Sequence, residues 1–137
     1  MAAFTIVGEK LPTQSSIAQL YGFLSDFKNF AGILPEDKVE NFTYDENHCA
    51  FTIKGITAMT IHLKEKSENE FLLFNSEGLA RFNFNLKASF YGNPNQKGES
   101  LIEMSGDLNP FILSMAEKPL KALVDSMSTK LSNLIVA

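Results

Sequence analysis

The fold class is decided by a stretch in the second half of the chain, RFNFNLKASF at residues 81–90. Its apolar residues alternate with polar ones, which is the period of a β-strand with one buried face and one solvated face. The apolar positions are Phe82, Phe84, Leu86, Ala88 and Phe90. Residues 59–64 repeat the pattern, so the sequence predicts an antiparallel sheet with one apolar face.

On both sides of this stretch, the two-residue period extends over residues from about 39 to 108. Turn residues at 46–48, 77–78 and 92–98 divide this region, because Asn, Gly and Pro favour tight turns. The predicted strands cover 39–45, 49–55, 56–66, 71–76, 79–91 and 99–108. With a first strand at 3–9 they make seven strands at the spacing of a meander.

Helical signals flank the strands. Residues 11–14 break the first strand, and Ser16 with Gln19 matches a capping box that begins the first of two short helices. Asn109 and Pro110 begin a long helix that should reach about Val136 and bend at Pro119. Its apolar stripe contains Ile112, Ala116, Leu120, Leu123, Met127, Leu131 and Leu134, while Ser128 and Ser132 should lie away from it.

Composition limits the class of protein. The 137 residues correspond to one domain, and the net charge of −4 argues against a nucleic-acid partner. A single Cys forms no internal disulfide, no apolar run reaches 18 residues, and residues 1–5 lack the pattern of a signal peptide. We therefore expect a cytoplasmic globular domain without a membrane span or a cofactor, whose oligomeric state the sequence leaves open.

The order of one strand, two short helices, six strands and a long C-terminal helix resembles the helix-grip fold of the START-like (SRPBCC) superfamily. Residues 17–30 are similar to the first helices of that superfamily, and residues 109–134 resemble its closing helix. The superfamily includes polyketide cyclases and lipid-transport proteins. The resemblance implies a single α+β domain over residues 1–137, with a curved seven-stranded antiparallel sheet and a long helix across its concave face. It also implies an internal cavity that accepts apolar molecules.

The apolar faces of sheet and helix are the predicted ligand-binding residues, since ligand pockets are mostly apolar. The same side chains are equally suited to filling a core, and both interpretations stay open. The candidates are Tyr44, Phe51, Ile53, Met59, Ile61, Phe82, Phe84, Phe90, Met104, Leu120, Leu123 and Met127. Tyr44 adds a hydroxyl that could orient a ligand, although such a group more often faces solvent.

Residues with reactive side chains show no catalytic pattern. His48 and His62 are not expected to converge with acids or with Cys49, which should be buried. Arg81, the only arginine, is expected on the solvated face beside Glu103. We therefore predict a carrier or binding protein for a small lipid-like or aromatic molecule, with no metal site. The alternatives are a polyketide cyclase or hydratase, which needs a polar pair in the cavity, and a protein-interaction domain that binds no ligand.

Overall fold

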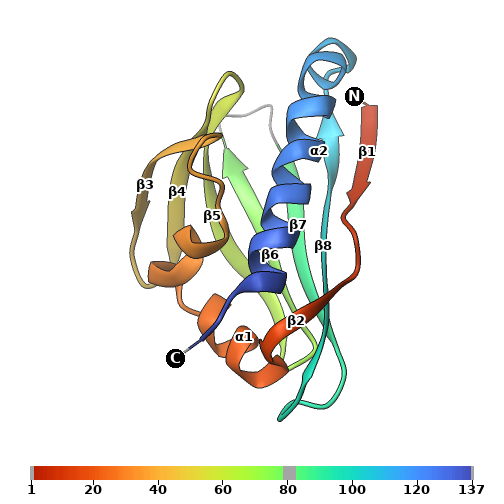
Figure 1. Ribbon diagram of the computed structural model, residues 1–137. Coiled ribbons are helices and arrows are strands. Elements are labelled where there is room, and N and C mark those ends of the chain that lie inside the picture. The colour runs from red at the N-terminus through yellow and green to blue at the C-terminus, as the bar shows by residue number, and fades with distance from the viewer. Residues whose placement is uncertain (1, 79–82, 137) are drawn as a thin grey trace.

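The computed structural model describes residues 2–78 and 83–136 and has the predicted α+β class, with an antiparallel sheet and a long C-terminal helix (Figure 1). Along the sheet the strands follow the order β1-β8-β7-β6-β5-β4-β3, and β2 pairs with β8 beyond the end of β1. The elements are β1 (Ala2–Val7), β2 (Leu11–Ser16), α1 (Ile17–Leu24), the 3-10 helix η1 (Phe27–Ile33), β3 (Val39–Tyr44), β4 (His48–Ile53), β5 (Thr57–Ser67), β6 (Phe71–Gly78), β7 (Asn83–Tyr91), β8 (Lys97–Leu108) and α2 (Pro110–Asn133).

Strand β2 corrects the sequence prediction, because residues 11–14 were expected to be a break and the short helices were expected to follow the first strand directly. Strand β8 is 12 residues long and β1 pairs only with Glu103–Leu108, so the first half of β8 has a free edge. Residues Leu11, Pro12 and Ser16 of β2 pair with this edge. Proline is tolerated in β2 because an edge strand does not need every backbone N–H.

The two short helices lie at one end of the sheet, and the first begins as predicted. The Ser16 hydroxyl accepts a hydrogen bond from the Gln19 amide, and the Gln19 side chain accepts one from the Ser16 amide, which completes the capping box. From η1, Phe27 and Phe30 turn toward the sheet. These helices therefore close the end of the concave face at which β2 enters α1 (Figure 1).

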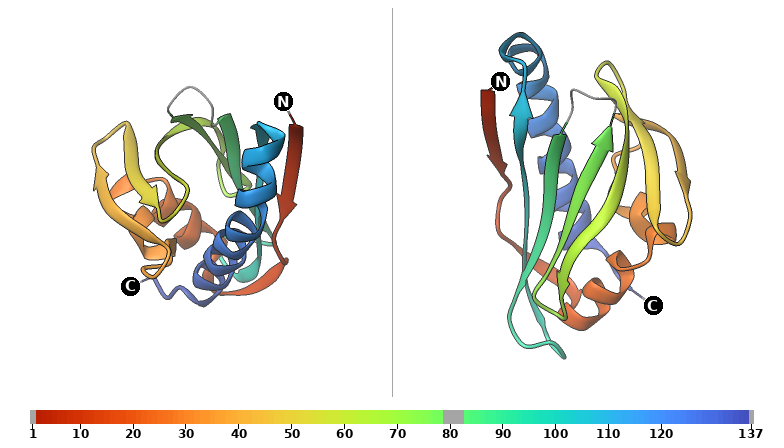
Figure 2. Two further views of the ribbon diagram at one scale, coloured as in Figure 1. Left: turned by 90° about the horizontal axis from the view of Figure 1, so that it is seen from above. Right: turned by 180° about the vertical axis from the view of Figure 1, so that it is seen from behind.

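Helix α2 begins as predicted, with the Asn109 side chain accepting from the Phe111 amide at 2.9 Å and proline in the first turn. It continues through Pro119, and its first turns and later turns follow different directions when seen from above (Figure 2). It ends at Asn133, short of the predicted Val136. The Ser15 hydroxyl donates to the Leu134 carbonyl at 2.8 Å and accepts from the Val136 amide, so this segment bonds to β2 instead of extending the helix.

The side of α2 that faces β2 carries a second correction. Ser128 and Ser132 were expected away from the buried stripe, yet both are buried. The Ser128 hydroxyl donates to the Val124 carbonyl at 2.8 Å, and the Ser132 hydroxyl donates to the Pro12 carbonyl of β2. Ser132 bonds to β2, and Ser128 lies beside Gly8 in the segment between β1 and β2, so the chain leading into β2 together with β2 covers this polar edge of the helix.

Candidate functional site

The predicted ligand-binding side chains converge, with one exception among those described, on one apolar cluster between the sheet and α2. Ten of them are at most 6% exposed: Phe51, Ile53, Met59, Ile61, Phe84, Phe90, Met104, Leu120, Leu123 and Met127. Phe82 and Arg81 lie outside the described residues. The cluster is the core of the domain, and the contact of these residues with a ligand stays a prediction.

Tyr44 is the exception. It lies on β3, the last strand in the sheet order, and its side chain is 56% exposed. Its ring packs beside Phe42, with 6.0 Å between the ring centroids. The structure therefore does not bring the Tyr44 hydroxyl to the apolar cluster.

Different helical elements cover different parts of the concave face of the sheet. Helix α2 packs along β8, β2 and β1, while η1 packs against β3 and β4. The η1 aromatic side chain Phe30 lies edge-on to Phe74 of β6 at 5.2 Å and is stacked with Phe51 of β4 at 6.5 Å. The cover by η1 does not extend to the opposite end, where the β4–β5 turn approaches the first turns of α2 (Figure 1).

A groove opens there between α2 and the β4–β5 turn. Its first part, which we call the apolar half, has a volume of about 260 Å³ and is mostly apolar. The β4–β5 turn depends on Gly55, whose φ of +79° is a conformation that other residues adopt at a cost. The apolar half is lined by Lys54, Gly55, Ile56, Ile112, Met115, Ala116 and Pro119.

The second part of the groove, which we call the basic half, has a volume of about 340 Å³. It shares Lys54 and Pro119 with the apolar half, so the two parts are contiguous. Of the predicted ligand-binding residues, Ile53 lies in its wall. The basic half is lined by Asp37, Lys38, Ile53, Lys54, Lys118, Pro119 and Ala122.

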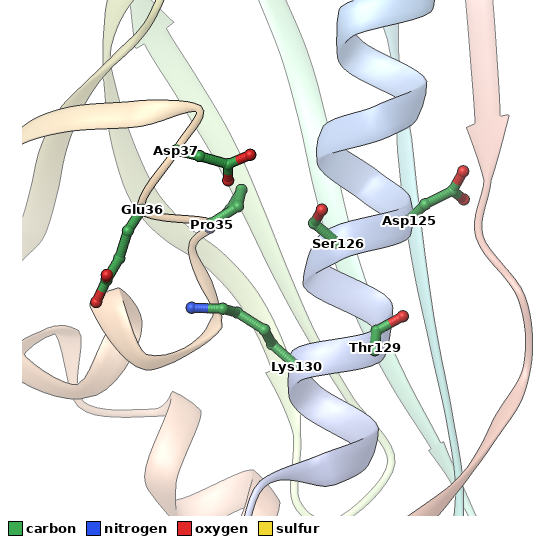
Figure 3. A pocket seen from close by; sticks show the side chains of 7 residues that line it. All are labelled: Pro35, Glu36, Asp37, Asp125, Ser126, Thr129 and Lys130. Carbon is green, nitrogen blue, oxygen red and sulfur yellow. The ribbon is translucent and has the colours of Figure 1, made fainter.

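Farther along α2, a shallow hollow of about 590 Å³ lies beside the 35–37 segment; we call it the polar hollow because most of its lining residues have polar or charged side chains. Figure 3 shows Lys130 reaching from α2 toward this segment, and its amine donates a hydrogen bond to the Leu34 carbonyl at 2.9 Å. Asp37 also lines the basic half, which places the hollow next to it. The Lys130 bond ties α2 to the end of η1 and occupies the charged group that a ligand would otherwise meet in the hollow.

Groups with shifted pKa values lie away from the groove. Burial raises the pKa of the Cys49 thiol to about 12, which keeps it protonated and unreactive near neutral pH. The pKa of Asp45 is lowered because its carboxylate accepts hydrogen bonds from the amides of Asn47 and His48.

The two histidines do come together, which the sequence prediction missed. Strand register places His48 opposite His62, with 5.5 Å between the ring centroids, and the His48 Nδ1 lies 3.0 Å from an Asp45 oxygen. Within the described residues, no group of three or more His, Cys, Asp or Glu side chains could hold a metal ion.

Sequence reasoning also missed most residues of the groove, above all Lys54, Ile56 and Lys118. One available signal was the apolar pair Phe111 and Met115, four residues apart on α2 and outside its buried stripe. Their side chains are 84% and 76% exposed. Large apolar groups exposed together typically mark a place of contact with another molecule.

No protein-family model and no curated protein matches the sequence. Solved structures do match in fold. Norcoclaurine synthase from Thalictrum flavum, as a point mutant with a transition-state analogue, is 10% identical, with a TM-score of 0.66 over 95% of this chain and 94% of that chain.

Two further matches have the same fold. A START superfamily protein from Mycobacterium smegmatis is 10% identical, with a TM-score of 0.63 over 93% of this chain and 96% of that chain. The di-domain ARO/CYC protein StfQ of the steffimycin biosynthetic pathway is 10% identical, with a TM-score of 0.65 over 95% of this chain and 49% of that one. At these identities the likeness concerns the fold, and it confirms the helix-grip architecture. None of the helices described here has the length and apolar character needed to cross a membrane.

Proposed function

We propose that this chain, which has the helix-grip fold of START-like proteins, binds or carries a small apolar molecule between its sheet and α2. The observation that carries the proposal is the apolar half of the groove, where Ile56, Ile112 and Ala116 form a recess of about 260 Å³ beside the core. A ligand would enter past Met115, which lines the apolar half and is 76% exposed.

The energy of such binding comes from burial of apolar surface. A dissociation constant of 1 μM corresponds to about 8 kcal/mol. At about 25 cal/mol per Å² this requires roughly 330 Å² of buried apolar area, before the loss of ligand freedom is counted. Ligand pockets usually have volumes of about 300–1,000 Å³. A ligand of micromolar affinity would therefore extend beyond the apolar half, either into the core or along the groove.

Binding is better supported than catalysis. The buried polar side chains of the described residues are serines and threonines, which do not act as general acids or bases near neutral pH. The buried thiol of Cys49 has a raised pKa and is a poor nucleophile. A cyclase would need an acid–base pair facing its substrate. Along the groove, Asp37 and Lys38 are paired with each other at 3.5 Å, and Lys54 is the one titratable residue among the described residues that line the apolar half. A carrier or binding role therefore accounts for more of the observations.

A second candidate function, contact with another protein, is favoured by the exposure of Phe111 and Met115. The two functions make different predictions for a Phe111→Ser, Met115→Ser variant. If the side chains only border a ligand site, the variant and the wild type have the same oligomeric state at all concentrations. If they form a protein contact, the variant dissociates at concentrations where the wild type remains associated.

The test of the proposed function uses the neutral apolar dye N-phenyl-1-naphthylamine. We expect saturable fluorescence enhancement with the wild type and at least tenfold weaker binding with Ile112→Asp, which places a charge in the apolar half. Ile112 lies in the first turn of α2, where an acidic side chain is favourable for the helix, so the fold should persist.

The matched control is Ile135→Asp, because Ile135 is 80% exposed and does not line the groove. It should leave dye binding unchanged, and circular dichroism should show that both variants are folded. The proposal is wrong if the folded wild type shows no saturable binding, or if the two variants weaken binding equally.

A further inference from the structure

The basic half of the groove concentrates positive charge on a protein whose net charge is −4. Three lysines, Lys38, Lys54 and Lys118, line it together with one carboxylate, that of Asp37. Lys38 and Lys54 are held side by side, since the Lys54 amide donates to the Lys38 carbonyl at 2.9 Å. Lys118 belongs to α2, on the other side of the groove.

The single carboxylate is already paired. The Lys38 amine lies 3.5 Å from the Asp37 carboxylate. No described carboxylate lies within the ion-pair distance of 4.0 Å from the amines of Lys54 or Lys118. The amines of Lys54 and Lys118 are therefore not held in an ion pair by a described carboxylate, and three lysines face one carboxylate along the basic half.

The cluster of lysines is confined to the basic half of the groove. The polar hollow next to the basic half is lined by three acidic residues and one lysine, the lysine already bonded to a carbonyl. On the opposite side lies the apolar half, with Ile56 and Ile112. The basic half is therefore the part of the groove where an anionic group meets the most lysines, and it lies directly beside the apolar half, with which it shares Lys54.

We infer that the ligand is a single-chain amphiphile with an anionic head group such as a carboxylate. This inference rests on the proposed function and specifies its ligand. The apolar chain lies in the apolar half against Ile56, Ile112 and Ala116, and the carboxylate lies in the basic half between Lys54 and Lys118. Lysine suits this role because its ammonium is a point charge with three donors on a flexible stem. The two halves together also meet the requirement for a ligand longer than the apolar half.

The test compares three compounds that share a ten-carbon chain, decanoate, decanol and decyltrimethylammonium, by isothermal titration calorimetry at pH 7 below their aggregation limits. We expect decanoate to bind at least tenfold more tightly than the other two. The preference should shrink between 20 and 500 mM salt, because screening weakens the charge attraction, whereas decanol binding should not weaken.

A Lys54→Met, Lys118→Met variant should lose the preference and bind decanoate and decanol equally. The matched control is Lys64→Met, Lys66→Met, which removes the same charge from exposed positions on β5 and should retain the preference. A separate measurement tests binding of the protein to vesicles with and without anionic lipid, since a bilayer also presents anionic head groups on apolar chains.

The outcomes separate the two proposals. Equal binding of decanoate and decanol to the wild type, or tighter binding of the cation, would overturn the anionic head group and leave the apolar-ligand function standing. Loss of preference in the control variant would overturn the assignment to Lys54 and Lys118. Binding to anionic vesicles without binding of free decanoate would overturn the free amphiphile as ligand. If no ten-carbon compound and no dye binds, the proposed function fails as well.

Discussion

Replacing Phe30 with alanine tests the finding that η1 closes one end of the concave face. Phe30 is fully buried and lies edge-on to Phe74 at 5.2 Å. A Phe→Ala change in a core costs about 3–5 kcal/mol, and an aromatic pair contributes about 0.5–1.5 kcal/mol beyond area burial. We therefore expect Phe30→Ala to lower the free energy of unfolding by about 4 kcal/mol.

The assay is urea unfolding followed by circular dichroism. With a slope of about 2 kcal/mol per M, a loss of this size lowers the midpoint by about 2 M while the slope stays constant. Phe111→Ala is the matched control, because the Phe111 side chain is 84% exposed and an exposed substitution usually changes stability by less than about 0.5 kcal/mol. A loss below about 1.5 kcal/mol for Phe30→Ala, or similar losses for both variants, would refute the packing described for η1.

Three further predictions concern the link between β2 and α2, the buried thiol and two glycines. Ser15→Ala removes a hydroxyl that bonds both a carbonyl and an amide after α2, so it should lower the free energy of unfolding by about 2 kcal/mol in urea titrations. The raised pKa of Cys49, about 12, means that from about pH 9 upward the unfolded chain loses the thiol proton while the native protein keeps it, so stability should fall with rising pH. Cys49→Ala should lack this part of the alkaline loss, which thermal unfolding between pH 8 and 11 measures. Gly98→Ala should destabilise by about 1–3 kcal/mol because the added Cβ would lie 2.2 Å from the Tyr91 carbonyl oxygen, whereas Gly22→Ala in α1, with nothing within 4 Å, should stabilise by up to about 1 kcal/mol. Equal effects of the two glycine changes would contradict the close approach at Gly98.

Alternation and capping predicted the parts of the fold that depend on neighbouring residues. The apolar positions of 81–90 that the structure describes are buried, and the capping residues Ser16 and Asn109 begin the two α-helices as expected. These signals are reliable because a strand face and a helix cap are each determined within a few residues of chain.

Strand β2 could not be predicted this way, because its pattern around Pro12 is that of a turn. Its formation depends on the free edge that the much longer β8 leaves beyond β1. The burial of Ser132 follows from its contact with β2, whereas Ser128 is buried beside Gly8 in the segment that leads into β2. Neither contact can be read from the helix sequence alone. The pairing of His48 with His62 likewise depends on strand register, which a single strand does not reveal.

The residues of the candidate site likewise fall into those that local sequence patterns predicted and those that they did not. Periodicity was enough to predict most of the apolar interior, since Phe51, Met59 and Met127 are buried as it requires. The position of the groove beside this interior, and the presence of both Lys54 and Lys118 in its wall, depend on how α2 packs against the β4–β5 turn. The physical reason is that periodicity depends on residues adjacent in the chain, whereas a groove is the volume left unfilled between segments far apart in it.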